Sequence, residues 1–283
     1  MKKGIEFIRL VGEERRVGKT LAEVSRHWKE GEEKFLFISP HDDDVILGAG
    51  LFMQLAHQEN VPIHVMVVTD GAMGYCSEEE KDGIVDIRRK ETYDCYESLG
   101  IPRENIHCLG FPDCNLSDYQ GRREAKPSDA AVVAGYTGLQ NAFTHYLREI
   151  APTQCFLPTS NDLHPDHKYV HQELLISLFH SCGSIWPELG TPLQHVPFVH
   201  EMGVYCDFSE PPQLRVKTPE SILEKKLEAI AVFKSQKQIG SLIDNVRESG
   251  PQEYFRALRF QLYRPSIYHD RFERKPHHQM LRR

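Results

Sequence analysis

Residues 35–51, with the sequence FLFISPHDDDVILGAGL, indicate how this chain folds. Residues 35–38 form a short, continuous apolar run that ends at Ser39 and Pro40, as is typical of a buried strand. From residue 45 to residue 59 the apolar side chains recur at helical spacing, and Asp44 is available as an N-cap. The stretch therefore predicts a buried strand followed directly by a helix, with three aspartates at the junction.

Strands and helices continue to alternate after this stretch. Further buried strands are predicted at 63–68, 105–109 and 154–157. Helices are predicted at 82–99, 128–150 and 164–179. Strands that alternate with helices of this length form a mostly parallel sheet that is covered on both faces.

Both ends of the chain depart from this pattern. Residues 19–33 are predicted to form an exposed or lightly packed helix. Beyond residue 185 we expect antiparallel strands at 196–205 and 214–217, and helices at 220–236 and 253–263. The predicted fold class is α/β: a three-layer sandwich with a Rossmann-like, mostly parallel sheet and short antiparallel additions near the C-terminus.

Composition and charge are those of a globular protein. At 283 residues the chain can bury a full core, and 40% hydrophobic with 27% charged residues argues against disorder. The formal net charge of −7 disfavours nucleic-acid binding. Seven cysteines without a C-x-x-C pair do not fit a disulfide framework, which favours a reducing compartment. Because no apolar run is long enough for a membrane span or a signal peptide, we expect a cytoplasmic protein.

Two short segments carry most of the chemistry of the sequence. They are His41-Asp42-Asp43-Asp44 and His164-Pro165-Asp166-His167. The first directly follows a predicted buried strand, and the second follows another after a loop. Binding sites in open parallel sheets form outside the carboxyl ends of the strands, so we expect the two segments to meet at one edge of the sheet.

Two histidines and a carboxylate are a suitable ligand set for a catalytic zinc ion, which keeps one position open for water. The ion lowers the pKa of that water from about 15.7 to near 7. A second carboxylate beside the water can then accept its proton. Three consecutive aspartates supply both carboxylates, because successive side chains at a strand end point in different directions.

Each segment also has a simpler interpretation. Carboxylates at a helix start are common, because they interact favourably with the N-terminal end of the helix dipole. An H-x-x-H pair alone is often structural. A helix cap, however, needs no second histidine segment at the same sheet edge, so the combination favours the metal site.

The segment at 35–51 resembles the signature strand and helix of the PIG-L/LmbE-like deacetylases, the N-acetylglucosaminyl deacetylase superfamily. The usual motif of that family is H-P-D-D-E, paired with a later H-P-D-H or H-x-x-H. The resemblance continues in the family's order through VMVVTDG at 65–71, RRKE at 88–91, LG at 99–100, GFPD at 110–113 and SQ at 235–236. It spans roughly residues 35–240 and implies one deacetylase domain at 1–283, with an N-terminal helical extension and a C-terminal helical tail.

The resemblance implies a role for seven residues. The metal, Zn²⁺ or another divalent transition metal, would be bound by His41, Asp44 and His167. Asp43 would be the general base, and His164 would stabilise the oxyanion or protonate the leaving amine. Arg88 and Asp113 would contact the substrate.

The sequence departs from the family motif at two positions. Asp42 stands in place of the proline, which loosens a rigid turn and adds a charge near the site. Val45 stands in place of the common glutamate and removes a carboxylate. Neither change removes a proposed ligand or the base, so activity is expected, with an altered rate or metal preference as the open question.

Three further residues have alternative interpretations. Arg88 either contacts substrate or pairs with Glu91 on a helix face. Asp113 either holds substrate hydroxyls or forms a turn. Asp162 either orients a histidine or is a solvated loop residue.

The function that these residues favour is metal-dependent removal of an acetyl group from an N-acetylglucosamine-type amino sugar or its conjugate. The expected partner is this small molecule, without nucleic acid or a membrane span. One alternative is another metal-dependent amidase or a two-metal phosphoesterase on the same scaffold. A second is a catalytically silent sugar-binding homologue, which the complete histidine and aspartate set disfavours.

Overall fold

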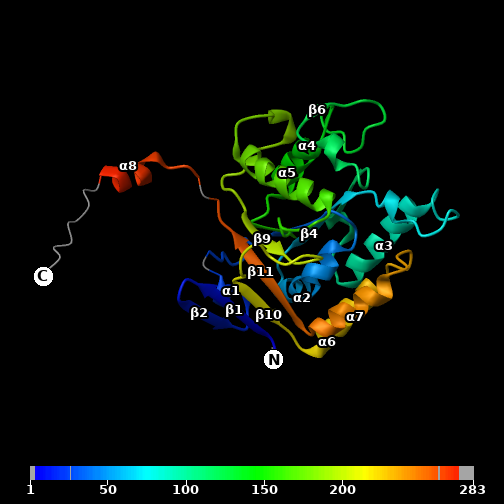
Figure 1. The fold of residues 1–283 in the computed structure, drawn as a ribbon, viewed down its shortest axis with the longest axis horizontal. Helices are drawn as coiled ribbons and strands as arrows, with labels where there is room; N and C mark the ends of the chain where they lie inside the picture. Colours follow the sequence, from blue (N-terminus) through cyan, green and yellow to red (C-terminus); the bar gives the residue numbers. More distant parts are fainter. Residues whose placement is uncertain (1–3, 26, 261, 274–283) are drawn as a thin grey trace, which may run out of the picture.

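A nine-stranded sheet runs through the protein in the computed structural model, which describes residues 4–25, 27–260 and 262–273 (Figure 1). The strand order is β2-β1-β10-β11-β9-β8-β3-β4-β5. The strands are β1 (Glu6–Val11), β2 (Glu14–Gly18), β3 (Phe35–Ser39), β4 (Ile63–Thr69), β5 (Ile106–Phe111), β8 (Gln154–Pro158), β9 (Phe198–Met202), β10 (Leu214–Lys217) and β11 (Gln252–Leu258). A small separate sheet pairs β6 (Arg123–Glu124) with β7 (Tyr136–Thr137).

Five neighbouring strands, β9, β8, β3, β4 and β5, run parallel to one another. β3 lies at their centre, where Phe35 is the register partner of Ile63 in β4 and of Gln154 in β8. Among these five strands β3 comes first along the chain. The next two, β4 and β5, are added on one side of it, and the last two, β8 and β9, are added on the other, so the direction of the connections reverses between β3 and β8. Ligands bind at such a switch point in open α/β sheets. The predicted Rossmann-like fold class is confirmed.

Helices cover both faces of this sheet (Figure 1). On one face α2 packs against α6, and α3 and α7 also contact α6, whereas α4 and α5 pack together on the other face. The helices are α1 (Leu21–Val24), α2 (Asp44–Gln58), α3 (Ile84–Ser98), α4 (Leu139–Ile150), α5 (Pro165–Cys182), α6 (Glu220–Ile230), α7 (Ile239–Ser249) and α8 (Pro265–Glu273). Short 3-10 helices lie at Ala72–Gly74, Arg103–Asn105, Leu116–Tyr119 and Pro187–Leu189.

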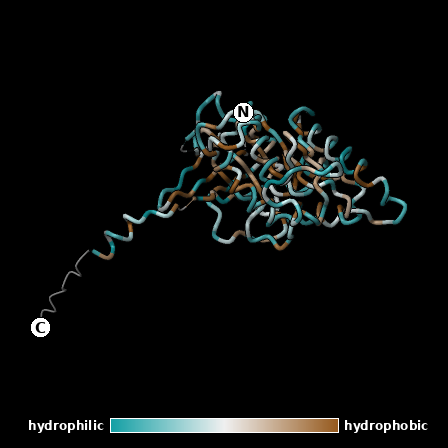
Figure 2. The backbone as a smooth tube through the Cα atoms, turned by 90° about the horizontal axis from the view of Figure 1, so that it is seen from above, coloured by the Kyte–Doolittle hydropathy of each residue, from teal (hydrophilic) through white to brown (hydrophobic). Residues whose placement is uncertain are grey.

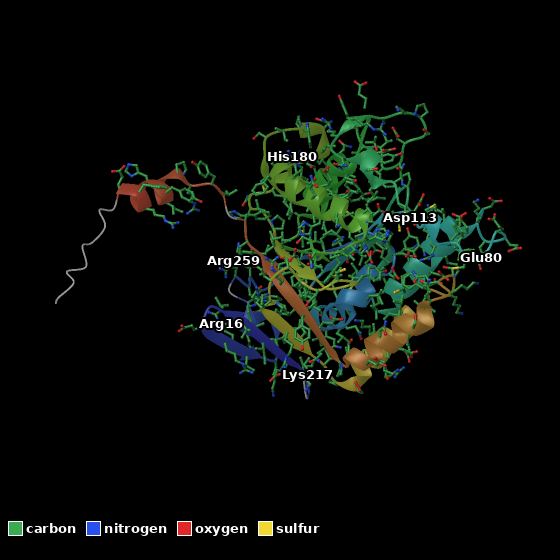
Figure 3. All side chains as sticks on the ribbon, in the orientation of Figure 1. Arg16, Glu80, Asp113, His180, Lys217 and Arg259 are labelled. Carbon is green, nitrogen blue, oxygen red and sulfur yellow. The ribbon has the colours of Figure 1, made fainter. Side chains whose placement is uncertain are left out.

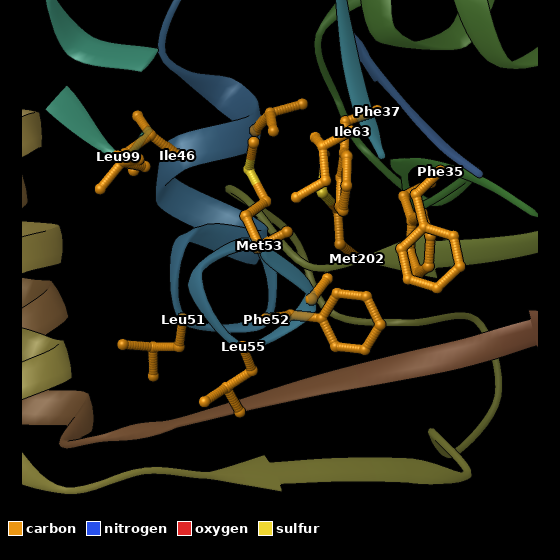
Figure 4. Close-up of a cluster of buried hydrophobic side chains, with 14 of the residues drawn as sticks. Phe35, Phe37, Ile46, Leu51, Phe52, Met53, Leu55, Ile63, Leu99 and Met202 are labelled. Atoms are coloured by element: carbon orange, nitrogen blue, oxygen red, sulfur yellow. The ribbon is translucent and has the colours of Figure 1, made fainter. Parts of the chain in front are cut away.

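The central strand β3 contributes to a hydrophobic core on each face. Phe35 and Phe37 belong to the core under α2, while Leu36 belongs to the core under α4 and α5, because alternate side chains point to opposite faces. Figure 4 shows Phe35 and Phe37 near Phe52 of α2 and Met202 of β9. Burying each such side chain contributes about 1.5–3 kcal/mol, which anchors the loop that follows β3.

The predicted N-terminal helical extension is wrong. Residues 4–25 contain a β-hairpin, β1 with β2, and a helix of only four residues, α1, which begins in a capping box at Thr20 and Glu23. β2 is a polar edge strand, and its charged sequence ERRVG lacks the apolar alternation that identifies a strand. β1 pairs with β10, so the antiparallel additions come from both ends of the chain.

The C-terminal part also differs from the prediction in two places. Residues 253–263 were expected to be helical, but β11 occupies most of this segment. Glu253 is buried beside Phe255 on the same strand, and a buried carboxylate masks the apolar alternation. The strand expected at 196–205 is β9, which is parallel to β8 and antiparallel only to β11.

The helix expected at 128–150 begins only at Leu139. Gly135 and Gly138 have φ values of +82° and +111°, which are incompatible with a helix, so the chain enters α4 from an irregular loop. α8, in the predicted C-terminal tail, extends away from the sheet (Figures 1 and 2), and residues 274–283 lie outside the described residues. None of the described helices combines the length and the hydropathy that crossing a membrane requires.

Candidate functional site

The two histidine segments meet at the switch point, because β3 and β8 are hydrogen-bonded neighbours. Side chains within the first segment hold its turn in place. The Ser39 hydroxyl donates to the carbonyl of His41 and accepts from the Val45 amide at 3.2 Å. The His41 amide donates to Asp44 Oδ2 at 2.8 Å. The turn is therefore well defined although Asp42 stands where the family has proline.

Three candidate ligand atoms form a small triangle at this point. His41 Nδ1 lies 3.2 Å from His167 Nε2 and 3.3 Å from Asp44 Oδ2. His167 Nε2 lies 3.1 Å from the same Asp44 oxygen. Ligands at about 2.0–2.1 Å from a tetrahedral zinc ion lie roughly 3.3–3.4 Å apart. The triangle therefore matches one face of a tetrahedral metal site.

The electrostatics of these three residues also favour a cation. Burial lowers the pKa of His41, but hydrogen bonds to nearby carboxylates outweigh burial and raise the pKa well above its ordinary value. Burial raises the pKa of Asp44, but His167 and His41 outweigh it and hold the pKa well below its usual range. Asp44 Oδ1 is buried and has no hydrogen-bond partner among the described residues. The residues thus fit a divalent metal ion.

Each of the two candidate ligand histidines has a carboxylate at its other ring nitrogen. His167 Nδ1 lies 3.1 Å from Asp162 Oδ2, and His41 Nε2 lies 3.3 Å from Asp113 Oδ1 and 3.4 Å from Asp166 Oδ2. Such carboxylates fix the ring orientation and the tautomer of metal-binding histidines. The placement of Asp162 agrees with the interpretation that it orients a histidine. Asp166 was given no role by the sequence analysis, although it lies between the two histidines of the second segment.

Asp43 is buried beside this triangle. Its Oδ2 accepts a hydrogen bond of 2.8 Å from Gln236 Nε2. Burial raises the pKa of Asp43 to about 7, and the charges of Asp42 and Asp44 act in the same direction. Gln236 was quoted from the sequence only as part of a resemblance, and its contact with Asp43 was not foreseen because 193 positions separate the two residues.

His164 lies against both other histidines, with ring centroids 4.5 Å from His41 and 5.2 Å from His167. Its Nδ1 accepts a hydrogen bond of 3.2 Å from the Asp166 amide, which places the proton of the neutral ring on Nε2. Burial lowers the pKa of His164, and the two neighbouring histidines lower it further. One ring nitrogen from each histidine lies within 4.8 Å of the others. The neutral tautomer of His164 therefore carries its proton on Nε2, and the ring is also close enough to the other two histidines to share a metal ion with them.

Asp42 and Arg88 form a buried ion pair. Arg88 Nη1 donates to the two carboxylate oxygens of Asp42 at 3.0 and 3.1 Å, and Arg88 Nη2 donates to the Gly74 carbonyl at 3.3 Å. Glu91 instead accepts two hydrogen bonds from Ser235, so the alternative of an Arg88–Glu91 pair is wrong. The charge that replaces the family's proline is thus matched by a cation.

Two further side chains complete the surroundings of the site. Asp113, labelled in Figure 3, also accepts a hydrogen bond of 3.1 Å from the Met73 amide. The ring of Tyr205 lies 5.6 Å from the ring of His167, measured between centroids. Tyr205 follows β9, whose carboxyl end lies at the same sheet edge. The sequence analysis missed Tyr205 because no motif surrounds it.

The sequence model of one protein family matches residues 36–177, about half of the chain, and the family is described as PIG-L: GlcNAc-PI de-N-acetylase. The matched segment contains both histidine segments. A search of curated proteins found no match to the chain.

Several solved structures have the same fold. A conserved protein from Thermus thermophilus has 21% identity and a TM-score of 0.62, with 82% of this chain and 98% of that chain covered. An N,N′-diacetylchitobiose deacetylase from Pyrococcus horikoshii has 22% identity and a TM-score of 0.61, with 80% and 84% covered. A 4-carboxy-2-hydroxymuconate hydratase from Pseudomonas putida has 15% identity and a TM-score of 0.62, with 82% and 98% covered.

A teicoplanin deacetylase, described as a zinc inhibited form, has 16% identity and a TM-score of 0.53, with 81% of this chain and 100% of that chain covered. At these identities the likeness establishes the fold alone, and the same fold is shared by proteins with deacetylase and hydratase names.

Proposed function

This chain belongs to the PIG-L family, and from that premise we propose that it hydrolyses the acetamide of an N-acetylglucosamine-type amino sugar or its conjugate. The products would be acetate and a free amine. The observation that carries the proposal is the triangle of His41, Asp44 and His167 with a further buried acid, Asp43, beside it. An amide hydrolase needs both a place for a cation and a group that accepts a proton from water.

We propose that His41, Asp44 and His167 hold one divalent ion, with zinc as the first candidate. When bound, such an ion lowers the pKa of water to near 7 and attracts the carbonyl oxygen of the amide. The chain's own contribution is to hold the ligands rigidly, through the Asp162 contact to His167 and the carboxylates around His41. A structurally similar deacetylase is described as a zinc inhibited form, and this description concerns that protein. Because of it, zinc, cobalt and manganese should be tested separately.

Asp43 is the proposed general base. A base works best when its pKa lies near the working pH, and burial has brought this carboxyl to about 7. The amide of Gln236 orients the carboxylate through Oδ2 and leaves Oδ1 for the attacking water. Asp43 would accept the proton from water as its oxygen attacks the amide carbonyl.

His164 is the proposed partner of the substrate oxygen. Because its Nδ1 is occupied by the Asp166 amide, its Nε2–H is available to donate to the negative charge that develops on the carbonyl oxygen. The proton that Asp43 has accepted would then pass to the leaving nitrogen. Substrate contacts by Arg88 and Asp113 stay predictions, and in the structure each side chain already engages a residue of the site, Asp42 and His41 respectively.

The test is release of acetate and primary amine from N-acetylglucosamine and from N,N′-diacetylchitobiose, with zinc, cobalt or manganese added in turn. We expect turnover with at least one metal, at one ion per chain. Asp43→Asn should lose about 10²–10⁴-fold in kcat and keep its metal content, because the base is not a ligand. Two tightly bound ions per chain would favour a two-metal phosphoesterase. Absence of acetate release from every acetamide, with binding retained, would favour a silent sugar-binding protein.

A further inference from the structure

A cavity of about 300 Å³ lies between β1, β9 and β11. Its lining includes Gln154 and Phe198, the first residues of the parallel strands β8 and β9. The candidate metal site lies at the carboxyl ends of the parallel strands, so this cavity lies at the opposite edge of the sheet. Ser25 and His27, after α1, complete the lining, and the ring of His27 stacks on Phe198 with centroids 5.0 Å apart. The cavity is large enough for a small molecule and is separate from the proposed active site.

The walls of this cavity carry positive charge. The described residues that line it include Arg9 of β1 and Arg259, which directly follows β11 and is labelled in Figure 3, but no aspartate or glutamate. Burial lowers the pKa of His200, another lining residue, to about 3, so its ring is neutral. The permanent charge of the lining therefore comes from the two arginines, which stay ionised at every physiological pH.

Arg9 differs from its neighbours because it has no ion-pair partner among the described residues. Three other arginines on the same group of strands each pair with a carboxylate: Arg16 with Glu14, Arg215 with Glu6 and Arg256 with Glu201. Arg9 is half-buried, and its Nε is buried without a hydrogen-bond partner. Burial lowers the pKa of Arg9, Arg16 lowers it further, and no carboxylate acts in the opposite direction. An unpaired cation that is partly removed from water costs free energy, which an anion in the cavity would offset.

The amide side chains of the lining are already used within the protein. Gln213 Oε1 accepts from the Ala257 amide at 2.8 Å. Gln154 Nε2 donates to Glu33 Oε2 at 3.1 Å, and Gln154 Oε1 lies 3.0 Å from His200 Nε2. The guanidinium groups are therefore the main donors that remain for a ligand, and they form their strongest hydrogen bonds with phosphate and carboxylate oxygens.

We propose that this cavity binds a small molecule through a phosphate monoester group, which pairs with Arg9 and is attracted by the exposed Arg259. A phosphate monoester carries a charge of about −1.5 to −2 at neutral pH and so matches both arginines, whereas a single carboxylate matches only one. Val11, Phe198 and Leu258 supply apolar surface for the rest of the ligand. The inference goes beyond the proposed function and does not depend on it, because the lining contains none of the candidate metal ligands.

Calorimetric titration of the full chain tests the proposal, with inorganic phosphate, glucose 6-phosphate and glucose as the probes. We expect both phosphates to bind and glucose not to bind. Arg9→Gln should raise the Kd of both phosphates at least about tenfold, because the half-buried ion pair is lost. Arg259→Gln should raise the Kd only about two- to fivefold, because water and salt screen an exposed charge.

Two control variants separate this site from other places where phosphate could bind. Arg15→Gln removes the same charge from the same β-hairpin, at an exposed position outside the lining, and should leave both Kd values unchanged. His167→Ala, at the candidate metal site, should also retain phosphate binding. Equal losses in Arg9→Gln and Arg15→Gln would indicate general charge attraction, and a loss in His167→Ala alone would place the phosphate at the metal site. Either result overturns the proposal, as does absence of binding, or tighter binding of citrate than of glucose 6-phosphate.

Urea denaturation provides an independent check, because a ligand that binds only the folded chain stabilises it. Glucose 6-phosphate should raise the urea midpoint of the wild type and of Arg15→Gln, but not that of Arg9→Gln. Without ligand, Arg9→Gln should be at least as stable as the wild type, since no partner within the protein is lost. A marked loss of stability in Arg9→Gln would mean that Arg9 already has a partner, and the assignment of an unpaired guanidinium would be wrong.

Discussion

Three consecutive aspartates differ in their electrostatic behaviour because each has different neighbours. Asp42 faces the guanidinium of Arg88, and Asp44 faces two imidazoles. Asp43 accepts a hydrogen bond from the neutral amide of Gln236 and forms no ion pair among the described residues, so burial and the charges of Asp42 and Asp44 raise its pKa to about 7. The proposed ligand, the proposed base and a paired charge thus come from one tripeptide, and the neighbours rather than the residue type distinguish them.

His167→Ala should remove the metal, because it deletes one corner of the ligand triangle. Asp162→Asn should act more gently and weaken metal affinity about 10–100-fold, because it changes only the group that orients the His167 ring. Metal content after dialysis against a competing chelator measures both effects. His57→Ala removes an exposed histidine outside the site and should keep full metal content. If His167→Ala retained one ion per chain, the assigned ligand set would be wrong.

Gln236→Ala should lower kcat by about tenfold to a hundredfold, because hydrogen bonds to charged groups contribute about 1.5–3 kcal/mol. KM and metal content should stay unchanged, since the side chain of Gln236 donates to the proposed base and, among the described residues, to none of the proposed ligands. Gln238→Ala, two positions further on an exposed turn, is the matched control and should behave as the wild type. A fall in metal content together with kcat would mean that Gln236 supports the ligands and not the base.

At the scale of elements, the sequence predicts those helices and strands whose local pattern of apolar residues is enough to identify them. The strand at Phe35–Ser39, the helix at Asp44–Gln58 and the strand at Gln154–Pro158 all follow from apolar spacing. The place of the site follows from the carboxyl ends of the two strands. The strands that the sequence pattern did not predict depend on partner residues far along the chain. β11 contains Glu253, whose burial makes sense only with Lys226 beside it, and β2 is a strand because β1 pairs with it.

The same limit applies to the candidate site. Sequence motifs identified His41, Asp43, Asp44 and His167, which the structure brings together. Tyr205 lies in a loop without a motif. Gln236 belongs to the SQ pair of the resemblance, but its contact with Asp43 spans 193 positions and required the fold. The Arg88–Asp42 pair joins α3 to the turn after β3 across 46 positions, so no helix-face pattern could predict it.

The Arg88–Asp42 pair also links α3 to the turn after β3, so its removal should destabilise the protein. Asp42→Ala leaves a buried guanidinium unpaired and should lower the free energy of unfolding by about 3–5 kcal/mol. Asp42→Ala combined with Arg88→Met should recover most of this loss, because no buried charge remains. Urea denaturation measures both variants. Asp94→Ala breaks an exposed pair with Lys90 on the same helix and should change stability little. Equal losses for single and double variants would argue that the pair is not electrostatic in origin.

At the scale of the whole molecule, the continuous sheet connects the two ends of the chain. β1 and β2 join through β10 and β11 to β9, and β9 joins the parallel strands that carry the site. We therefore propose that the chain behaves as one domain and unfolds in one transition, since no boundary interrupts the hydrogen bonding across the sheet.

Lowering the pH should destabilise the protein because of His200, which lies on β9 near the middle of the sheet. Its Nε2 lies 3.0 Å from Gln154 Oε1, and burial lowers its pKa to about 3, with Arg9 acting in the same direction. Between pH 6.5 and 3 the unfolded chain binds a proton that the folded chain excludes. Stability is therefore fully present above pH 6.5 and is lost towards pH 3, by at most about 1.4 kcal/mol per pH unit.

His200→Gln removes this titration, so its unfolding free energy should depend less steeply on pH than that of the wild type, whatever its absolute stability. Urea denaturation at pH 7.5, 6.5, 5.5 and 4.5 measures the two slopes. His195→Gln, at an exposed loop position, should keep the slope of the wild type because no buried imidazole is removed. Parallel pH profiles for the wild type and His200→Gln would show that His200 is protonated in the folded sheet, and the assignment of a neutral, buried imidazole would have to be abandoned.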